Sequence, residues 1–552
     1  MATNNTKLEL TWIGKDDERP SAEPRLLIED AKYSHGVVET GELPNGKKWN
    51  GNMLIHGDNL LALKALEENY TNAVKCIYID PPYNTGNAFE HYDDGLEHSI
   101  WLSLMRERII LLHKLLSEDG VLLINLDETE HAYCKVICDE VFGRKNFIGD
   151  LIWQKRKGGG NDSRFFAIDH DYIIVFAKNS SKSVHSKKWL VSQSEEYRKR
   201  YKEVAEDGRR YYWDTLSRDG LQNPIPVQVR CPDGTVLKIN SQQSQKTIEE
   251  GLVSGEIRLT KSKNGWTLHH RVYIPEGQVL RSILTDVGTN KTAGDEIAYL
   301  FGDTKAFDYP KPETLIQRLL ELTTKKGDLV LDSFLGSGTT AAVAHKMGRR
   351  YIGIELGEHA YSHCALRLQK VVSGKDQGGI SASENWKGGG GFKFYELAPS
   401  LLKKDSHGQL VINREYNADM LAAAMAKMEG FTYEPSADTF WKQGYSSETD
   451  YIYTTTQFLT VESLDSILET MADGESLLIC CKAFQPECKN FSSRITVKKI
   501  PSVLLGRCEF DHDDYSLNII ELPQTEKIED SEDMDNYPEA SSDNLSSEPS
   551  LF

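Results

Sequence analysis

The stretch that most constrains the fold of this chain is KCIYIDPPYNTGN, residues 75–87. Residues 76–79 predict a short buried strand, and the pair Pro81-Pro82 must end it, because two consecutive prolines fix φ and remove two backbone donors. Open α/β sheets bind their ligands at a rigid loop of this kind, at the carboxyl end of a strand. Asp80 and a proline carbonyl can each accept an N–H from a planar amino group, while Tyr83 stacks on its ring.

The length of the chain, 552 residues, exceeds what one hydrophobic core supports and predicts two to four domains. Hydrophobic residues make up 39% of the sequence, and no apolar run approaches the roughly 18 residues of a membrane helix. The nine cysteines lack the paired CxxC spacing of a zinc site. We therefore expect a cytoplasmic protein with reduced thiols, no bound metal and no membrane contact.

The distribution of charge says more about partners than the net charge of −19. Residues 521–552 contain ten acidic side chains and one lysine, which predicts a disordered acidic tail. Residues 151–284 contain 23 Lys and Arg against 15 Asp and Glu. An acidic tail thus masks a basic middle segment, and arginines, lysines and aromatics together suit contact with nucleic acid.

A second motif follows a proline-led helix start at residues 309–313, YPKPE. Residues 328–340, DLVLDSFLGSGTT, predict a hydrophobic strand, a tight glycine turn and a helix, and residues 350–355 predict a further strand that ends in Glu355. Glycines let a ligand approach the backbone, and a terminal carboxylate can bind a ribose diol. The spacing of Gly336, Gly338 and Ala341 also satisfies an NAD fingerprint, so a dehydrogenase is an alternative at this point.

Asp58 stands between a short apolar run, residues 53–55, and a helical pattern that begins at Leu60. It is either the cap of that helix or an acceptor for the amino group of a ligand. Further along, helical spacing predicts helices over 99–117 and 131–142 with a buried strand at 121–124 between them. Short alternating segments with turn signals predict a small β-rich insertion over 227–274.

These motifs resemble those of a known family. Asp80-Pro81-Pro82-Tyr83 is similar to the catalytic motif of amino-directed DNA methyltransferases, and Asn84-Thr85-Gly86 matches its adenine-specific members. DSFLGSGTT resembles the S-adenosylmethionine motif of the same enzymes, which disfavours a dehydrogenase. The catalytic loop precedes the cofactor turn, with a basic insertion between them, as in the β class. Together with TDVGTNKTAGDEIAYLF and YPKPETL, the pattern over residues 54–370 resembles modification subunits of type III restriction systems and their solitary relatives.

The resemblance implies an α/β fold: a Rossmann-like, S-adenosylmethionine-dependent methyltransferase sheet with a basic target-recognition insertion and a C-terminal accessory α+β domain. The implied domains are an N-terminal extension (1–50), a catalytic half (51–180), the target-recognition insertion (181–285), a cofactor-binding half (286–372), the accessory domain (373–522) and the acidic tail (523–552).

The resemblance also assigns the site residues. The catalytic residues are Asp80, Pro81, Pro82 and Tyr83, and no metal is implied. Asp332 and the glycine turn would hold the amino acid portion of the cofactor, Glu355 its ribose hydroxyls, and Lys311-Pro312 would pack around the methionine. The full predicted cofactor-binding set is Asp58, Lys311, Pro312, Asp332, Phe334, Gly336, Ser337, Gly338, Thr339 and Glu355.

The implied reaction is methylation of N6 of a flipped-out adenine in duplex DNA, with S-adenosylmethionine as the methyl donor. Two alternatives stay open. One is cytosine N4 methylation, although those enzymes more often have Ser in place of Asp80; the other is a DNA-recognition subunit that acts mainly as a binding module in a defence complex. The expected partners are double-stranded DNA, a possible helicase-nuclease restriction subunit and a second copy in a homodimer, in a bacterial cytoplasm at the nucleoid.

Overall fold

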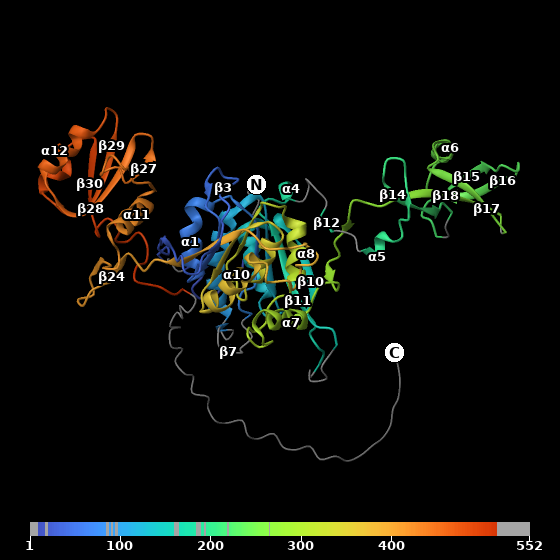
Figure 1. Cartoon of the computed structure of the whole chain (residues 1–552), viewed down its shortest axis with the longest axis horizontal. Coiled ribbons are helices and arrows are strands. Elements are labelled where there is room, and N and C mark those ends of the chain that lie inside the picture. The colour runs from blue at the N-terminus through green and yellow to red at the C-terminus, as the bar shows by residue number, and fades with distance from the viewer. Residues whose placement is uncertain are drawn as a thin grey trace, which may run out of the picture.

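The computed structural model describes residues 9–16, 20–83, 88–89, 92–93, 98–158, 165–183, 189–191, 195–217, 220–263 and 265–515. A central body contains the large sheet and is flanked by two lobes, one formed by the insertion and one by the C-terminal segment (Figure 1). The predicted adenine-specific extension, residues 84–86, and the predicted acidic tail lie outside the described residues.

The central sheet has the strand order β1-β23-β5-β22-β21-β6-β9-β11-β10-β20, with β2 also paired to β23. All neighbouring pairs from β23 to β9 are parallel, whereas β11 is antiparallel to both β9 and β10. The strands are β1 Leu27–Glu29, β2 His35–Gly36, β5 Asn52–His56, β6 Val74–Ile79, β9 Leu116–Leu126, β10 Phe147–Gln154, β11 His170–Ala177, β20 Ile283–Leu284, β21 Leu329–Asp332, β22 Arg350–Glu355 and β23 Gly391–Leu397.

Helices cover both faces of this sheet (Figure 1). One hydrophobic core contains Leu61 and Trp101 from the first two helices, and the other contains Leu315 and Val343 from helices later in the chain. The helices are α1 Asn59–Tyr70, α2 His98–Leu115, α3 His131–Cys138, α7 Asn290–Phe301, α8 Glu313–Thr323, α9 Thr339–Lys346 and α10 Leu366–Val372. The predicted α/β sheet is therefore confirmed.

The order of the strands creates a crevice between β6 and β21. From β6 the chain passes through α2 to β9 on one side, whereas from β21 it passes through α9 to β22 on the other. The loops after β6 and β21 therefore diverge. Open α/β sheets bind ligands at such a switch point, and the predicted catalytic loop and glycine turn follow these two strands.

The central sheet extends beyond the predicted domain boundaries at both ends. β1 and β2, within the predicted N-terminal extension, pair with β23. β23 lies beyond the predicted boundary at residue 372, yet it pairs with β5 from Asn52↔Phe392 to His56↔Glu396. The sequence predicts a turn into a strand at residues 388–395, which is confirmed as β23, but backbone pairing between segments more than 300 residues apart leaves no local sequence signal, so its pairing with β1, β2 and β5 was not predicted.

The insertion forms the lobe that carries α6 and β14 to β18 in Figure 1. It leaves and re-enters the body through β12 and β19, which pair as Leu190↔Val279 and Val191↔Gln278. The short strands match the predicted β-rich character, but α6 was not expected; Ser244 caps it and Ile248 anchors it in the core. The elements are β12 Leu190–Val191, α5 Glu195–Arg198, β13 Glu203–Val204, β14 Arg210–Thr215, β15 Ile225–Arg230, β16 Val236–Ser241, α6 Gln245–Ser254, β17 Ile257–Ser262, β18 Gly265–Tyr273 and β19 Gln278–Val279.

The C-terminal lobe has its own five-stranded sheet in the order β26-β27-β28-β29-β30, with the last three strands parallel. It also has its own hydrophobic cores. Because it combines a mixed sheet with helices, this lobe is α+β. Its elements are β24 Leu402–Lys404, β25 Leu410–Ile412, α11 Ala418–Glu429, β26 Thr432–Tyr433, β27 Gly444–Ser447, β28 Asp450–Leu459, α12 Val461–Thr470, β29 Ser476–Phe484 and β30 Ile495–Lys499. Across the described residues, every helix is too short or too polar to cross a bilayer.

Candidate active site

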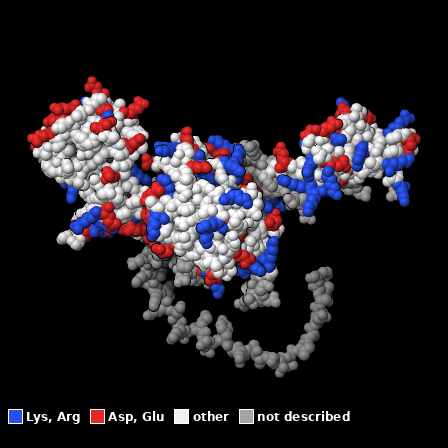
Figure 2. Space-filling model, in the orientation of Figure 1, with Lys and Arg blue, Asp and Glu red and all other residues white. Residues whose placement is uncertain are grey.

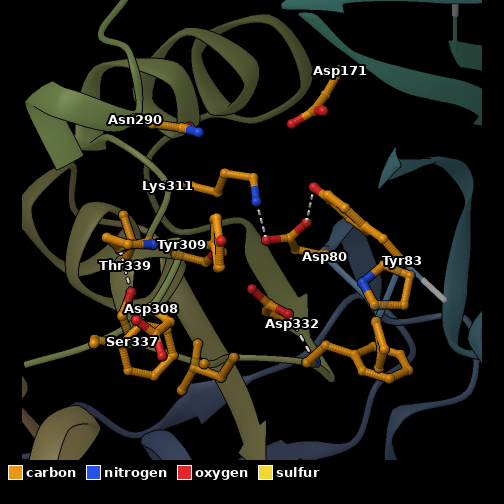
Figure 3. A pocket seen from close by; sticks show the side chains of 18 of the residues that line it. Asp80, Tyr83, Asp171, Asn290, Asp308, Tyr309, Lys311, Asp332, Ser337 and Thr339 are labelled. Atoms are coloured by element: carbon orange, nitrogen blue, oxygen red, sulfur yellow. Dashed lines mark hydrogen bonds and ion pairs between the residues drawn. The ribbon is translucent and has the colours of Figure 1, made fainter. Parts of the chain in front are cut away.

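A cavity of about 260 Å³ opens at the crevice between the carboxyl ends of β6 and β21 (Figure 3). The predicted residues that line it are Asp80, Pro81, Pro82, Tyr83, Lys311, Asp332, Phe334, Gly336, Ser337 and Thr339. Four predicted residues do not line it: Asp58, Pro312, Gly338 and Glu355. Segments 230 residues apart in the sequence thus meet in one cavity.

Asp80 stands at the centre of the cavity, and both of its carboxylate oxygens have partners. Lys311 forms an ion pair with Oδ2, and the Tyr83 hydroxyl donates to Oδ1 at 2.7 Å (Figure 3). The Lys311 ammonium also lies 5.3 Å from the centre of the Tyr83 ring. The side chain of Lys311 is 8% exposed and that of Asp80 is 22% exposed, so this pair is partly withdrawn from water.

The loop is rigid because side chains from neighbouring elements hold it. The Pro82 carbonyl accepts the indole N–H of Trp101 at 2.7 Å, which fixes the second proline against α2. Burial and the charge of Asp80 raise the pKa of the Tyr83 hydroxyl well above its usual value. Tyr83 therefore stays protonated and remains the donor to Asp80 at neutral pH.

Asn125, which the sequence did not single out, completes this arrangement. It lies at the end of β9, the parallel neighbour of β6, and is fully buried. Its amide donates to the Tyr83 hydroxyl and, at 3.4 Å, to Asp80 Oδ1. A polar side chain at the carboxyl end of a strand is common, so the sequence around Asn125 does not mark it as a site residue. Its place in the site follows from the pairing of β6 with β9.

The glycine turn brings backbone close to the cavity. Gly336 and Gly338 have φ of 56° and 79°, a region that favours glycine. A Cβ at Gly338 would also lie 3.2 Å from the Cα of Cys364. The turn begins with Asp332, which accepts the Phe334 amide at 3.0 Å. Ser337 and Thr339 share a hydroxyl hydrogen bond of 2.9 Å at the start of α9.

Asp332 carries the most perturbed carboxylate that faces the cavity. Burial raises its pKa to about 7, and the negative charges of Asp80 and Glu355 add to the increase, against hydrogen bonds from Thr340 and Phe334. A buried carboxylate with a raised pKa is a common feature of functional sites. A cation bound next to Asp332 would favour its ionised form.

Glu355 and Asp58 support the site from behind the cavity wall. Glu355 accepts the Gly336 amide at 2.7 Å and the Gly357 amide at 3.1 Å, so it fixes the turn. Asp58 accepts the amides of Leu60 and Leu61 at 2.8 and 3.1 Å, and it contacts buried Arg108 at 3.4 Å. Asp58 is therefore the cap of α1, and its role as an acceptor for a ligand stays a prediction.

The segment that precedes Lys311 is held against β10. The Trp153 indole donates to the Gly288 carbonyl at 2.9 Å, and the Asn290 amide donates to the Lys155 carbonyl at 2.9 Å. A Cβ at Gly288 would lie 2.7 Å from that of Pro312, so Pro312 packs tightly there instead of lining the cavity. Tyr309 lines the cavity with a φ of 51°, which is unusual for a residue other than glycine.

The opposite wall contains further charged residues that the sequence did not identify. Lys155, the residue after β10, and Asp171, from β11, form an ion pair of 2.6 Å, and both line the cavity. Asp127 also lines it, and burial raises its pKa to about 6. Within the described part of the chain, no group of three or more His, Cys, Asp or Glu is arranged to hold a metal ion.

Three features of the cavity define what it can do chemically. Asp80 can accept an N–H at a rigid loop, Tyr83 offers an aromatic plane, and the glycine turn with Asp332 can hold a second molecule that carries positive charge. The cavity thus suits transfer between two bound molecules, one of which is planar and amino-substituted.

Comparison with known proteins gives concordant matches. Residues 74–365 match the family described as DNA methylase. The chain is 34% identical over 405 residues to the probable HindVI Mod subunit of a type III restriction-modification enzyme from Haemophilus influenzae, an alignment that covers 63% of this chain and 54% of that protein. It is 32% identical over 371 residues to the StyLTI Mod subunit of Salmonella typhimurium, with 60% and 55% covered. It is 30% identical over 321 residues to the type II methyltransferase M.KpnI of Klebsiella pneumoniae, with 52% and 75% covered. The chain therefore spans about half the length of the two Mod subunits.

Proposed function

This chain belongs to the DNA methylase family, and from that premise we propose that it transfers a methyl group from S-adenosylmethionine to N6 of an adenine in duplex DNA. The observation that carries the proposal is the meeting of the Asp80 loop and the Asp332 glycine turn at a single cavity. One element suits an amino-substituted base, and the other suits a cofactor. A dehydrogenase would use the glycine turn but would have no need of the Asp80 loop.

The residues of the turn fit S-adenosylmethionine. Asp332 is a carboxylate whose pKa is raised to about 7 by burial and, to a smaller extent, by the charges of Asp80 and Glu355, and the cofactor carries an ammonium and a sulfonium group that would favour its ionised form. Gly336 brings backbone to the cavity, with Phe334 and Ser337 beside it. We assign Asp332 and the turn to the amino acid portion. S-adenosylmethionine, when bound, supplies an activated methyl group.

The remaining assignments follow the family. Glu355, which ends β22 and fixes the glycine turn through two backbone hydrogen bonds, would bind the ribose hydroxyls. Lys311 and Pro312 would flank the methionine, Lys311 from the cavity and Pro312 from behind it. Asp58 would act mainly through its cap of α1.

The residues of the loop act on the base. An adenine inside a duplex hides N6, so the base must leave the stack to reach the cavity. Asp80 would accept one N6–H and the Pro81 carbonyl the other, which frees the nitrogen lone pair for attack, while Tyr83 stacks on the ring. As the N–C bond forms, the bond between the methyl group and the cofactor's sulfur would break, and the nitrogen would give up one proton, which the Asp80 carboxylate could accept. Position and charge therefore dominate the rate.

This arrangement requires Asp80 to exchange partners. In the free protein its oxygens contact Lys311, Tyr83 and Asn125. An incoming amino group must share or displace one of these contacts, and the 2.7 Å hydrogen bond from Tyr83 is the natural one to yield, because the same ring must turn to stack on the base. The Lys311 contact would remain and hold the carboxylate in place.

The wider roles follow from the domain organisation. We propose that residues 181–285 recognise the target sequence, and that the protein serves as the modification and recognition subunit of a type III-like restriction system, or as a solitary relative. A homodimer and a helicase-nuclease partner belong to this proposal. The similarity to two proteins named as Mod subunits of type III restriction-modification enzymes supports the partner subunit.

The experiment that tests the reaction uses purified protein, methyl-labelled S-adenosylmethionine and unmethylated duplex DNA, with the product digested to nucleosides. We expect label in N6-methyladenine, lost in Asp80→Ala and kept in Asp119→Ala, a control on the exposed turn of β9. Label in N4-methylcytosine would overturn the base assignment and keep the mechanism. No transfer to DNA despite measurable cofactor binding would overturn the proposed substrate.

A further inference from the structure

The four-stranded sheet of the insertion lobe has two unlike faces. Its strands pair antiparallel in the order β13-β14-β18-β17, so directly opposed residues share a face. Ile257 and Leu268 point to one face, where they form the lobe's small core with Val227 and Val229 of β15. Tyr211 and Trp213 lie on the other face, and neither belongs to any of the hydrophobic cores.

On this second face, three arginine side chains lie over three aromatic rings. We call these six residues the arginine ladder: Arg258, Trp213, Arg271, Tyr211, Tyr273 and Arg209. The Arg258 guanidinium lies 4.1 Å from the Trp213 ring, and that of Arg271 lies 5.5 Å from Trp213 and 4.7 Å from Tyr211. Tyr211 is 5.7 Å from Tyr273, over which Arg209 lies at 4.0 Å.

The ladder draws on three separate strands, β14, β17 and β18, and on Arg209 just before β14. Tyr211 is opposite Tyr273 and Trp213 is opposite Arg271 in the β14–β18 register, while Arg258 is opposite His269 in β17–β18. A row of contacts across strands is fixed by the sheet itself, so the arginines are ordered before any partner arrives. The lobe has Lys and Arg gathered on its surface, including near α5 and β14 (Figure 2).

Stacking on a ring orders a guanidinium and leaves its N–H edge available. That edge matches phosphate oxygens, and it matches O6 and N7 of guanine in the major groove as a bidentate donor. Carboxylates lie nearby: Asp207 contacts Arg209 at 2.6 Å and Glu256 contacts Arg271 at 3.3 Å. The Asp207 and Glu256 side chains are 49% and 42% exposed, so water already weakens both pairs and a phosphate can replace them.

We propose that the arginine ladder is the surface through which the insertion lobe contacts duplex DNA, with its guanidiniums on phosphates and on guanine edges. This inference deepens the proposed function, on which its choice of partner rests. Duplex DNA fits because a sheet face enters or lies along a groove in known readers, and because the ladder offers ordered positive charge. The aromatic rings hold the arginines and exclude water from one side of each.

The test compares two triple variants of the full-length protein. Arg209→Gln, Arg258→Gln and Arg271→Gln together remove three charges from the ladder. The control variant removes three exposed charges from elements outside the ladder sheet, β15, β16 and α6: it combines Arg230→Gln, Lys238→Gln and Lys246→Gln. The lobe core lies between these elements and the ladder. Thermal melting verifies that both variants are folded; if the first triple variant is not, the single variant Arg258→Gln takes its place.

Binding is measured by fluorescence anisotropy with a labelled duplex of mixed sequence, from about 50 to 200 mM salt. We expect the ladder variant to lose at least about tenfold in affinity and its log–log salt slope to fall by about two to three, roughly 0.9 per lost phosphate contact. The control variant should lose less than about threefold. Equal losses in both variants, or tighter binding of the wild type to single strands than to the duplex, would overturn the proposal.

Two further readouts separate this proposal from the proposed reaction. Cofactor affinity, measured by calorimetry, should be equal in the wild type and both variants, because the ladder lies outside the cavity. If the wild type binds duplex DNA through the ladder but transfers no methyl group, the proposed reaction is wrong and the proposed DNA-binding surface is retained. If the wild type methylates DNA and the ladder variant binds duplex DNA as tightly as the control variant, the proposed DNA-binding surface is wrong and the proposed reaction is retained.

Discussion

The cavity of the central body and the ladder of the insertion lobe use charge in opposite ways. In the cavity, Asp80 pairs with Lys311 and Asp171 pairs with Lys155, all with side chains less than a quarter exposed. In the ladder, rings order the arginines at the surface of the lobe, where the Arg209 side chain is 60% exposed and that of Arg271 is 23% exposed. Chemistry needs fixed charges withdrawn from water, where they act strongly, whereas recognition needs charges that are ordered yet accessible.

The two regions are also separated in the chain. The insertion joins the body through the short β12–β19 pair, so the ladder and the cavity share no described contact. Substitutions in one region should therefore change one measured quantity and leave the other unchanged. Four predictions test this separation, beyond the experiments described above.

The largest effect is expected for Asp80→Asn, which keeps the size of the side chain and removes its charge. We expect kcat to fall by at least about a hundredfold, as for loss of one preorganised polar group in other active sites. Duplex affinity should stay within about twofold, because the ladder is untouched. A comparable loss of DNA affinity, measured by anisotropy, would show that the two regions are not separate.

Next is Lys311→Met, which leaves the partly buried Asp80 carboxylate without its cation. An uncompensated carboxylate takes up a proton more readily, and the protonated group accepts an N–H more weakly and cannot take up the proton that N6 gives up. We expect kcat to fall about thirtyfold, close to 2 kcal/mol of transition-state stabilisation, with the rate recovering partly as pH rises. Lys305→Met, at an exposed position six residues earlier, is the matched control. An unchanged pH–rate profile in Lys311→Met would contradict this role for Lys311.

The pH dependence of cofactor binding should follow Asp332. Its pKa of about 7 in the free protein means that the carboxylate is protonated below pH 7 and ionised above it. Because the ionised form attracts a cationic cofactor, affinity should fall about tenfold from about pH 8 to pH 6. Calorimetry in Asp332→Asn should give a weak, flat profile. Parallel profiles in the two proteins would rule out Asp332 as the titrating group.

The smallest effect is expected for Trp213→Leu, which keeps the charge of the ladder but removes the ring that orders Arg258. We expect duplex affinity to fall about three- to fivefold with an unchanged salt slope, because ordering is lost and not a phosphate contact. Phe440→Leu, an exposed ring in the C-terminal lobe, is the control. A reduced slope in Trp213→Leu would mean that Arg258 loses its phosphate contact altogether when the ring is absent, and is not merely less ordered.

The sequence alone identified the elements that follow local rules. The proline pair ended β6 at Asp80, glycine spacing marked the turn after β21, and helical periodicity located α2 and α8. It missed α6, whose short amphipathic pattern is hidden among turn signals, and it left Asp58 open between two roles. Asp58 caps α1 through amides two and three residues further along the chain, so this role follows from local sequence. Its contact with Arg108, 50 residues away, depends on the tertiary structure.

The identity of the two motifs, and with them the predicted chemistry, was determined by the sequence itself, because each motif is contiguous and its residue types fix what it can bind. Tertiary structure decided everything that joins segments far apart in the chain. Asn125 reached Tyr83 through the pairing of β6 with β9, and Lys311 reached Asp80 across 231 positions. The ladder exists only in the register of β14, β17 and β18. Such contacts depend on which strands become neighbours, and the hydrophobic pattern of a single strand does not specify its neighbours.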